Sequence, residues 1–473
     1  MKTSISTKNL LIGWAIKLVF AAIFILIHTY YYSDGILYGD VANFIQDSRV
    51  ISEFAQKEPW EFTQLFFGYN SNDLILHQTH LADTNIWSYG DNGDFINDNR
   101  LIIRINTLIH LIAFGNIWVH VLIFAFISYV GVLLLYKTFK DLTNRPYFLY
   151  YTLLIFPTIS FWGGGITKET LLVFSIGIFF WAIKKIRKNE HLFSSFSLLC
   201  LGIILLLFNK PHVGLFIIPL TSILIIIDRF GFSRKTLLTL GLSLVAGFTV
   251  LCFTPSKVNL VERISYKQKD LMNLGTGGIF FITDSSFCAF DHELLENFDY
   301  KKSEGLIVVN EDSKGKYKLF GSDYFYPFEM RASSKQYEVY HVIAPSKSIV
   351  SVPPINNSPL QLLKNTPTSL LNVLVRPFPS DGGSSLKHLL FIENILFLFF
   401  VIVLLKNRIK LNKKKASWFY YLLFSGVSLV LIIGWTTPIL GAIARYKMAP
   451  LLLIVIALCL ILPPKKTIDE IPV

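Results

Sequence analysis

Long, unbroken apolar runs constrain the fold of this chain more than any other feature. The first extends from Leu10 to Tyr31, and similar runs recur along the sequence. A bilayer offers the backbone no hydrogen bonds, so runs of about 18 or more apolar residues predict membrane-spanning elements. The runs are continuous rather than alternating, which favours helices over barrel strands. With 52% hydrophobic and 16% charged residues, the chain is expected to be an all-α polytopic membrane protein.

The apolar runs predict about ten transmembrane helices. Several are near 15 residues, which is short for a span but typical of helices that break around a cavity. The first run lacks a small-residue cleavage site and is too long for a signal-peptide core, so we expect it to be retained. The expected spans are residues 10–31, 117–136, 147–162, 170–184, 192–208, 213–228, 236–253, 388–405, 417–436 and 448–463.

Basic residues predict the orientation, because cytoplasmic loops are enriched in lysine and arginine. The segment from Tyr32 to Arg100 holds eleven acidic and three basic residues, as expected outside. We therefore expect a multi-pass inner-membrane protein with both termini in the cytoplasm. The same distribution accounts for the net charge of +12 without a nucleic-acid partner. The residues expected inside are Lys137, Lys140, Arg145, Lys184, Lys185, Arg187, Lys188, Arg229, Arg234, Lys235, Lys406, Arg408, Lys410, Lys413, Lys414, Lys415, Lys465 and Lys466.

Two large outer segments organise the chain. Residues 32–116 form a loop within an N-terminal membrane module of seven spans, residues 1–253. Its stretch Leu101–Ala113 is too short to span and predicts an amphipathic helix at the outer interface. Residues 254–387 form a large periplasmic loop, and residues 388–473 a C-terminal module of three spans.

The large periplasmic loop is expected to be a mixed α/β region. Strand-like pieces occur at residues 278–283, 306–309 and 337–342. A cluster of proline, asparagine and serine then precedes a helical stretch at residues 360–374.

The first candidate site follows the first span, in Tyr38-Gly39-Asp40. A carboxylate at Asp40 could accept a proton from a sugar hydroxyl as a general base, or ligate a divalent cation. Alternatively, Asp40 is the N-cap of the helix that the following residues predict. Asp47 lies two turns further on the same helix face, either as a supporting acid or as a solvated surface acid.

The second candidate site is the turn Trp162-Gly163-Gly164-Gly165-Ile166-Thr167-Lys168-Glu169 between two expected spans. Three glycines allow the backbone to approach a ligand closely, and amides in such a turn can hold an anion. Lys168 adds a cation at the start of a helix, which suits a phosphate. The alternative is a tight turn in which Lys168 and Glu169 pair with each other.

Further cations are expected on the outer side, against the bias of the positive-inside rule. Arg445 is followed by Tyr446, and Arg376 lies in Val-Arg-Pro-Phe-Pro. Lys210 and His212 lie between two expected spans. Arginine suits bidentate recognition of phosphate, although contact with lipid headgroups would also explain these positions.

Other signals are weaker. His77 and His80 resemble a metal-binding pair, but only Asp83 lies at ligand spacing, which does not establish a metal site. Glu393 lies about one turn inside an expected span and could serve as a partner for a neighbouring helix. Lys17 is expected to extend its amino group towards the inner surface.

Together these segments resemble the GT-C superfamily of integral-membrane glycosyltransferases. Tyr38-Gly39-Asp40 matches the place of that family's functional acid, and the turn ending in Lys168-Glu169 resembles a Ser-Gly-x-x-Lys-Glu turn of bacterial relatives. The stretch from Asn99 to Tyr136 and the segments around Arg376 and Arg445 are also similar. The chain departs from the pattern where many members carry an acidic pair, because Val41 follows Asp40.

The resemblance implies transfer of one sugar from a polyprenyl-phosphate donor to a glycan, lipid or protein acceptor, as in cell-envelope polysaccharide biosynthesis. Asp40 would be the base, while Lys168, Arg445 and Arg376 would bind the donor phosphate. Asp47, Glu169, Lys210, His212 and Tyr446 would support them. No cofactor is implied beyond a possible divalent cation.

Two alternative functions remain open. An O-antigen-type polysaccharide polymerase would require Arg376 and Arg445 and could dispense with Asp40. A lipid-linked sugar flippase or transporter would line its path with charges. The expected spans hold few charged residues, among them Lys17 and Glu393, and this scarcity argues against transport.

Overall fold

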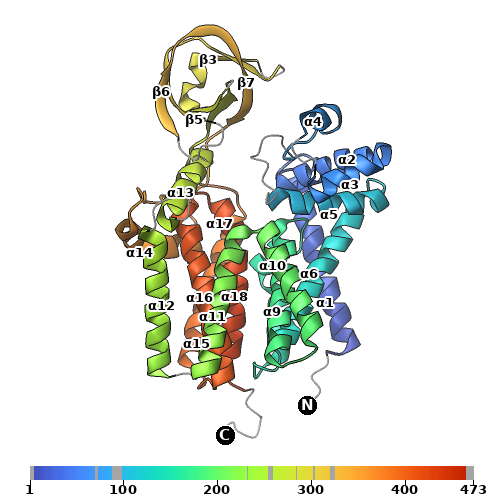
Figure 1. Cartoon of the computed structure of the whole chain (residues 1–473), viewed down its shortest axis with the longest axis vertical. Coiled ribbons are helices and arrows are strands. Elements are labelled where there is room, and N and C mark those ends of the chain that lie inside the picture. The colour runs from blue at the N-terminus through green and yellow to red at the C-terminus, as the bar shows by residue number, and fades with distance from the viewer. Residues whose placement is uncertain are drawn as a thin grey trace. The chain divides into compact units, whose positions relative to one another are not determined.

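The computed structural model describes residues 5–69, 73–87, 98–231, 233–253, 259–283, 285–301, 304–319 and 325–464. It consists mainly of helices, with one separate antiparallel sheet (Figure 1). The chain forms two compact units. The first unit comprises Met1–Leu238, Phe399–Leu429 and Lys447–Val473, and the second comprises Thr239–Leu398 and Val430–Tyr446.

Among the described residues of the first unit, the regular secondary structure is helical. Helices α12 (Arg234–Phe253), α15 (Lys387–Lys406) and α16 (Lys413–Thr436) contribute residues to both units. The other helices of the first unit are α1 (Thr7–Leu26), the π-helical turn η1 (Ile27–Tyr31), α2 (Asp40–Lys57), α3 (Pro59–Phe67), α4 (Leu74–His80), α5 (Asp98–Ala113), α6 (Ile117–Phe139), α7 (Pro146–Ile155), α8 (Pro157–Trp162), α9 (Lys168–Arg187), α10 (Leu192–Asn209), α11 (Pro211–Phe230) and α18 (Met448–Leu460).

Six of the described helices are long and apolar enough to cross a membrane: α1 with η1, α6, α10, α11, α15 and α16. Helices α17 (Leu440–Tyr446) and α18 are bent by 45° and would form a seventh span together. These helices are consistent with a multi-pass membrane protein. All ten expected spans fall on helices, but the count of ten is not confirmed. Helices α7 and α8 are short, and α9 carries charged residues at both ends.

Pro157 divides the expected span 147–162 into α7 and α8. A proline cannot donate the helical hydrogen bond, and it drives the residue before it out of the helical region. Phe156 accordingly has an extended ψ of 115°. The break carries the following glycine turn against α1, where a Cβ on Gly165 would overlap the ring of Phe24. The three glycines, Gly163 to Gly165, are all buried.

Helices α2 to α5 gather at the end of α1 and α6 that lies away from the N-terminus (Figure 1). Helix α2 packs along α5, and their apolar faces share one core with the end of α1. The helix expected at residues 101–113 is confirmed as α5. Buried residues that join this layer include Phe44, Ile51, Phe54, Ile102 and Ile103.

Lys17 does not extend to a surface as expected. Its side chain is fully buried within the first unit, and its amino group has no hydrogen-bond partner among the described residues. It lies on α1, which packs against α6, α7 and α8 along its length, so the lysine stem meets other helices before it could reach water.

The second unit contains a seven-stranded antiparallel sheet with strand order β3-β4-β7-β1-β2-β5-β6. The strands expected at residues 278–283, 306–309 and 337–342 are confirmed as β1, β4 and β7, and the expected helix as α14 (Pro359–Leu374). The hydrophobic core of the sheet includes Phe281, Phe290 and Ile307. The remaining elements are α13 (Leu260–Thr276), β1 (Gly278–Ile282), β2 (Ser286–Phe290), η2 (His292–Asn297), β3 (Phe298–Lys301), β4 (Leu306–Val309), β5 (Ser313–Leu319), β6 (Tyr326–Met330) and β7 (Ser333–Ile343).

Candidate functional site

Two acid–lysine pairs lie together where α5, α9 and α11 begin. Lys168 Nζ lies 2.8 Å from Asp98 Oδ2, and Lys210 Nζ lies 2.8 Å from Glu169 Oε1. Because Lys168 and Glu169 are neighbours in the chain, the two pairs form one group. His212 also acts electrostatically on Asp98. We call these five residues the charge cluster.

Local sequence fixes the ends of the helices that carry the charge cluster. Thr167 Oγ1 accepts a hydrogen bond from the Thr170 N–H at 3.2 Å and donates one to the Trp162 carbonyl at 2.6 Å. This N-cap starts α9 directly after the glycine turn. Pro211 occupies the first position of α11, where a missing N–H costs nothing. Lys168 and Lys210 are thereby held at two helix starts.

Lysines at helix starts oppose the helix dipole, whose positive end lies there. The partner acids offset this unfavourable interaction. Helix α10 also holds the start of α9 in place, because Asn209 Nδ2 donates a hydrogen bond to the Lys168 carbonyl at 2.8 Å. An anionic ligand at the same place would interact favourably with both the amino groups and the helix ends. The geometry therefore suits binding of an anion such as a phosphate.

The two pairs differ in their exposure to solvent. The side chains of Lys210 and Glu169 are 6% and 2% exposed, whereas Asp98 is 40% exposed beside a Lys168 that is 10% exposed. Burial alone would raise the pKa of Asp98. The ion pair and hydrogen bond with Lys168 outweigh burial, with smaller contributions from Lys210 and His212, and hold that pKa below its usual value. Asp98 is thus an ionised, half-exposed carboxylate at the edge of a buried charged group.

The structure brings together four residues that the sequence had suggested separately: Lys168, Glu169, Lys210 and His212. The alternative in which Lys168 and Glu169 pair with each other is wrong, because each binds a residue of another helix. Sequence reasoning did not single out Asp98. Its only signal was its position just before Asn99-Arg100, as one of many acids in an acidic segment.

Asp40 lies in the first turn of α2, where it is exposed. Gly39, with a φ of 84°, is the N-cap, so the alternative role of Asp40 as the cap is wrong by one residue. The Gly39 Cα lies close to the ring of His28, since a Cβ there would be 3.9 Å from His28 Cδ2. Asp40 therefore begins α2 beside η1, and its role as a base stays a prediction.

Asp47 is buried rather than solvated. Its carboxylate accepts hydrogen bonds from the N–H groups of Asn85, Ile86 and Trp87, at 2.6, 3.0 and 2.7 Å. Burial raises the pKa of Asp47, although these three N–H groups favour the ionised form and oppose the rise. The contacts indicate that Asp47 anchors residues 85–87 to α2.

Aromatic rings surround His28 at the π-helical turn, a place where helices often carry functional residues. The ring of Phe24 stacks on His28 with centroids 4.1 Å apart, and Phe161 and Trp162 lie at 6.4 and 6.3 Å. His28 Nδ1 is 2.9 Å from the Phe24 carbonyl. The glycine turn thus contacts α1 through an aromatic cluster that the sequence did not predict.

The remaining candidates belong to the second unit. Arg376 Nη1 lies 3.3 Å from Asp381 Oδ1, and its guanidinium lies 5.3 Å from the ring centre of Phe378. Arg445 and Tyr446 occupy α17. A shared phosphate site of these arginines with Lys168 stays a prediction.

His77 and His80, the two histidines that resemble a metal-binding pair, both lie on α4. His77 is buried on α4, and the ring of His80 lies 4.7 Å from that of Phe54. Within the part of the chain that the structure describes, no group of three or more histidine, cysteine, aspartate or glutamate side chains could hold a metal ion.

No protein-family model matches the chain, and neither the curated proteins nor the solved structures contain a significant match. The resemblance to GT-C glycosyltransferases rests on the short segments quoted above.

Proposed function

We propose that this chain is a membrane glycosyltransferase of the GT-C type. It would transfer a sugar from a polyprenyl-phosphate donor to an acceptor at the outer face of the bacterial inner membrane. The charge cluster carries this proposal. Charged groups buried at the ends of membrane helices are costly, so their presence calls for a role.

The donor phosphate would bind at Lys168 and Lys210. A polyprenyl chain stays in the bilayer while its phosphate lies at the interface, the level at which spanning helices end. The phosphate would replace Asp98 as the partner of Lys168. The two helix starts add their own positive ends. As the bond between the sugar and the phosphate breaks, these groups would stabilise the charge that the phosphate gains.

A carboxylate would activate the acceptor. It takes the proton of the acceptor hydroxyl, the hydroxyl oxygen bonds to the anomeric carbon, and the bond from that carbon to the phosphate oxygen breaks. Asp40 is the base that the resemblance implies. Asp98 is a second candidate, because it is ionised and half-exposed. A phosphate bound to Lys168 would release it.

The proposal is tested in the native host with the single substitutions Lys168→Met, Asp98→Asn and Asp40→Asn. Membrane insertion is checked for each, and surface glycans and lipid-linked intermediates are profiled by mass spectrometry. We expect Lys168→Met to remove one sugar from a glycan while its lipid-linked donor accumulates. Whichever aspartate variant gives the same result identifies the base. The control is Asp83→Asn, because Asp83 is an exposed acid of the same outer segment.

Unchanged glycans in the Lys168 and both aspartate variants would rule the proposal out. Loss of long polymers specifically in Arg376 and Arg445 variants would instead identify a polymerase.

A further inference from the structure

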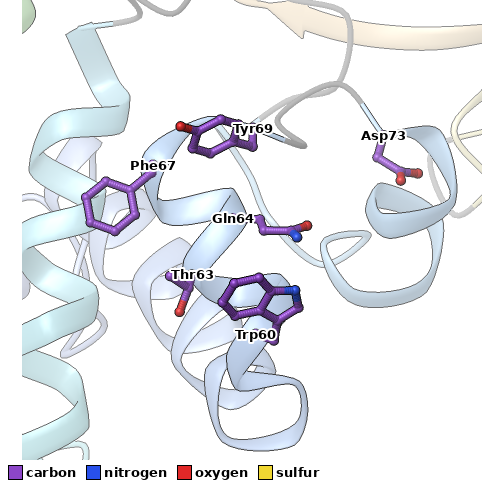
Figure 2. A pocket seen from close by; sticks show the side chains of 6 residues that line it. All are labelled: Trp60, Thr63, Gln64, Phe67, Tyr69 and Asp73. Atoms are coloured by element: carbon purple, nitrogen blue, oxygen red, sulfur yellow. The ribbon is translucent and has the colours of Figure 1, made fainter.

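A cleft of about 560 Å³ lies between α3 and α4, apart from the charge cluster. Its lining residues are Trp60, Thr63, Gln64, Phe67, Tyr69 and Asp73. Figure 2 shows Trp60 and Gln64 on the side of α3 that faces Asp73, which stands across the cleft at the start of α4. The volume is within the usual range for a small-molecule site.

The aromatic side chains of this cleft are largely exposed. Trp60 is 73% exposed and Tyr69 is 87% exposed. Trp60 and Gln64 are four residues apart on α3, so they lie one above the other on the same helix face. An indole ring therefore lies beside an amide that can both donate and accept hydrogen bonds.

The lining chemistry selects a class of ligand. Among the described lining residues there is one carboxylate and no lysine, arginine or histidine, which disfavours a phosphate or another anion. A sugar ring offers an apolar face that can pack on an indole, and hydroxyl groups at its edge. The Gln64 amide and the Asp73 carboxylate could bind those hydroxyl groups.

Asp73 is held in place for this role. Its Oδ1 accepts the N–H groups of Ile75 and Leu76 at 2.9 and 3.1 Å, which caps α4. These bonds fix the carboxylate at the wall of the cleft. A cation would also be attracted by Asp73 and the rings. However, Thr63 and Gln64 provide polar atoms that a quaternary ammonium could not use.

We infer that the α3–α4 cleft binds a neutral saccharide unit, packed on Trp60 and hydrogen-bonded by Gln64 and Asp73. This inference rests on the proposed function, for which it supplies a subsite on the acceptor glycan. Saccharide binding there requires no donor and no transfer step.

The test uses the full chain in nanodiscs, since common maltoside detergents carry sugars themselves. The probes are soluble neutral oligosaccharides of glucose, galactose, mannose or N-acetylglucosamine, with an acidic oligosaccharide and choline for comparison. We expect saturable binding of at least one neutral oligosaccharide. Trp60→Ala should weaken it by about tenfold or more, and Trp60→Phe should retain much of it. Phe114→Ala removes an aromatic ring that is 94% exposed elsewhere in the same unit, and should have no effect.

Several results would overturn the inference. These are failure to bind any neutral oligosaccharide, binding that Trp60→Ala leaves intact, or preferential binding of choline. The fluorescence that is lost in Trp60→Phe reports on Trp60 among the eight tryptophans. Quenching of that fluorescence by brominated lipids would likewise overturn the inference, since it would place the ring in the bilayer. Lys168→Met should abolish transfer without affecting oligosaccharide binding. The transfer assay therefore tests the proposed function, and the binding assay tests this subsite independently.

Discussion

Lys210 Nζ lies 2.8 Å from Glu169 Oε1, and both side chains are almost fully buried. Glu169→Gln would leave the lysine charge without its compensating carboxylate. Breaking a buried pair in this way costs about 3–5 kcal/mol, so we expect a clear fall in the thermal unfolding temperature of the purified protein.

Glu190→Gln is the matched control, because Glu190 lies 3.5 Å from Lys188 in an exposed pair. That change should cost less than about 1 kcal/mol. The double variant Glu169→Leu with Lys210→Met should recover much of the stability, since both charges are removed. Equal melting of the Glu169 and Glu190 variants would contradict the buried pairing.

The pair of Asp98 with Lys168 predicts a pH dependence. Because the pKa of Asp98 is lowered in the folded protein, the pair stabilises the fold fully above the pKa of the unfolded carboxyl, about 3.9. That contribution is lost as the pH falls through the lower folded pKa. The difference in unfolding temperature between the wild type and Asp98→Asn should be constant above a pH of about 4 and shrink below it. A difference that is the same at every pH would exclude the pairing.

The three N–H groups that donate to Asp47 predict a local effect. In Asp47→Asn, an NH₂ group replaces one acceptor oxygen and faces backbone donors. Loss of such an acceptor costs about 1–3 kcal/mol, so the amides of residues 85–87 should exchange hydrogen at least about fivefold faster. Asp83→Asn changes an exposed acid nearby and should leave these amides unchanged. Unaltered exchange in the Asp47 variant would argue against the anchoring role.

The sequence predicts the elements whose signals are local. The apolar runs locate the spans, and the β-branched and aromatic pieces at β1, β4 and β7 locate three of the seven strands. Strand β5, Ser313–Leu319, was missed because its alternating lysines leave little apolar signal. Helices α3 and α4 were missed because they are short helices within a segment that offered no long periodic pattern.

The charge cluster shows what local patterns cannot provide. Lys168, Glu169 and Lys210 were recognised as candidates from the types of their neighbours. Their pairing depends on how α5, α9 and α11 meet, which brings Asp98 to a lysine seventy positions later in the chain. The prediction that Lys17 reaches the inner surface was wrong for the same reason, since the burial of Lys17 depends on helices that follow much later in the chain.

The basic loops predict that residues 254–387 lie outside and that both termini lie in the cytoplasm. Single cysteines introduced for labelling test this in intact cells, after replacement of the four native cysteines. An impermeant maleimide should label a cysteine at exposed Ser334 on β7, but should label one at exposed Lys8 only after the cells are opened. Labelling with the opposite pattern would reverse the topology and would remove the outer-face site.

Helices α6 and α9 predict a strong effect of a small substitution. A Cβ added at Gly131 would lie 2.8 Å from the Cα of Phe174, and backbone atoms cannot move aside as a flexible side chain can. Close packing through small residues is typical of helices in membranes. Gly131→Ala should therefore lower the free energy of unfolding by about 1–3 kcal/mol, measured by thermal or denaturant unfolding.

Gly241→Ala on α12 is the matched control, because no described heavy atom lies within 4 Å of the added Cβ. It should be neutral or stabilise its helix by up to about 1 kcal/mol. If both variants unfold like the wild type, the close approach of α6 and α9 is not the packing that stabilises this unit.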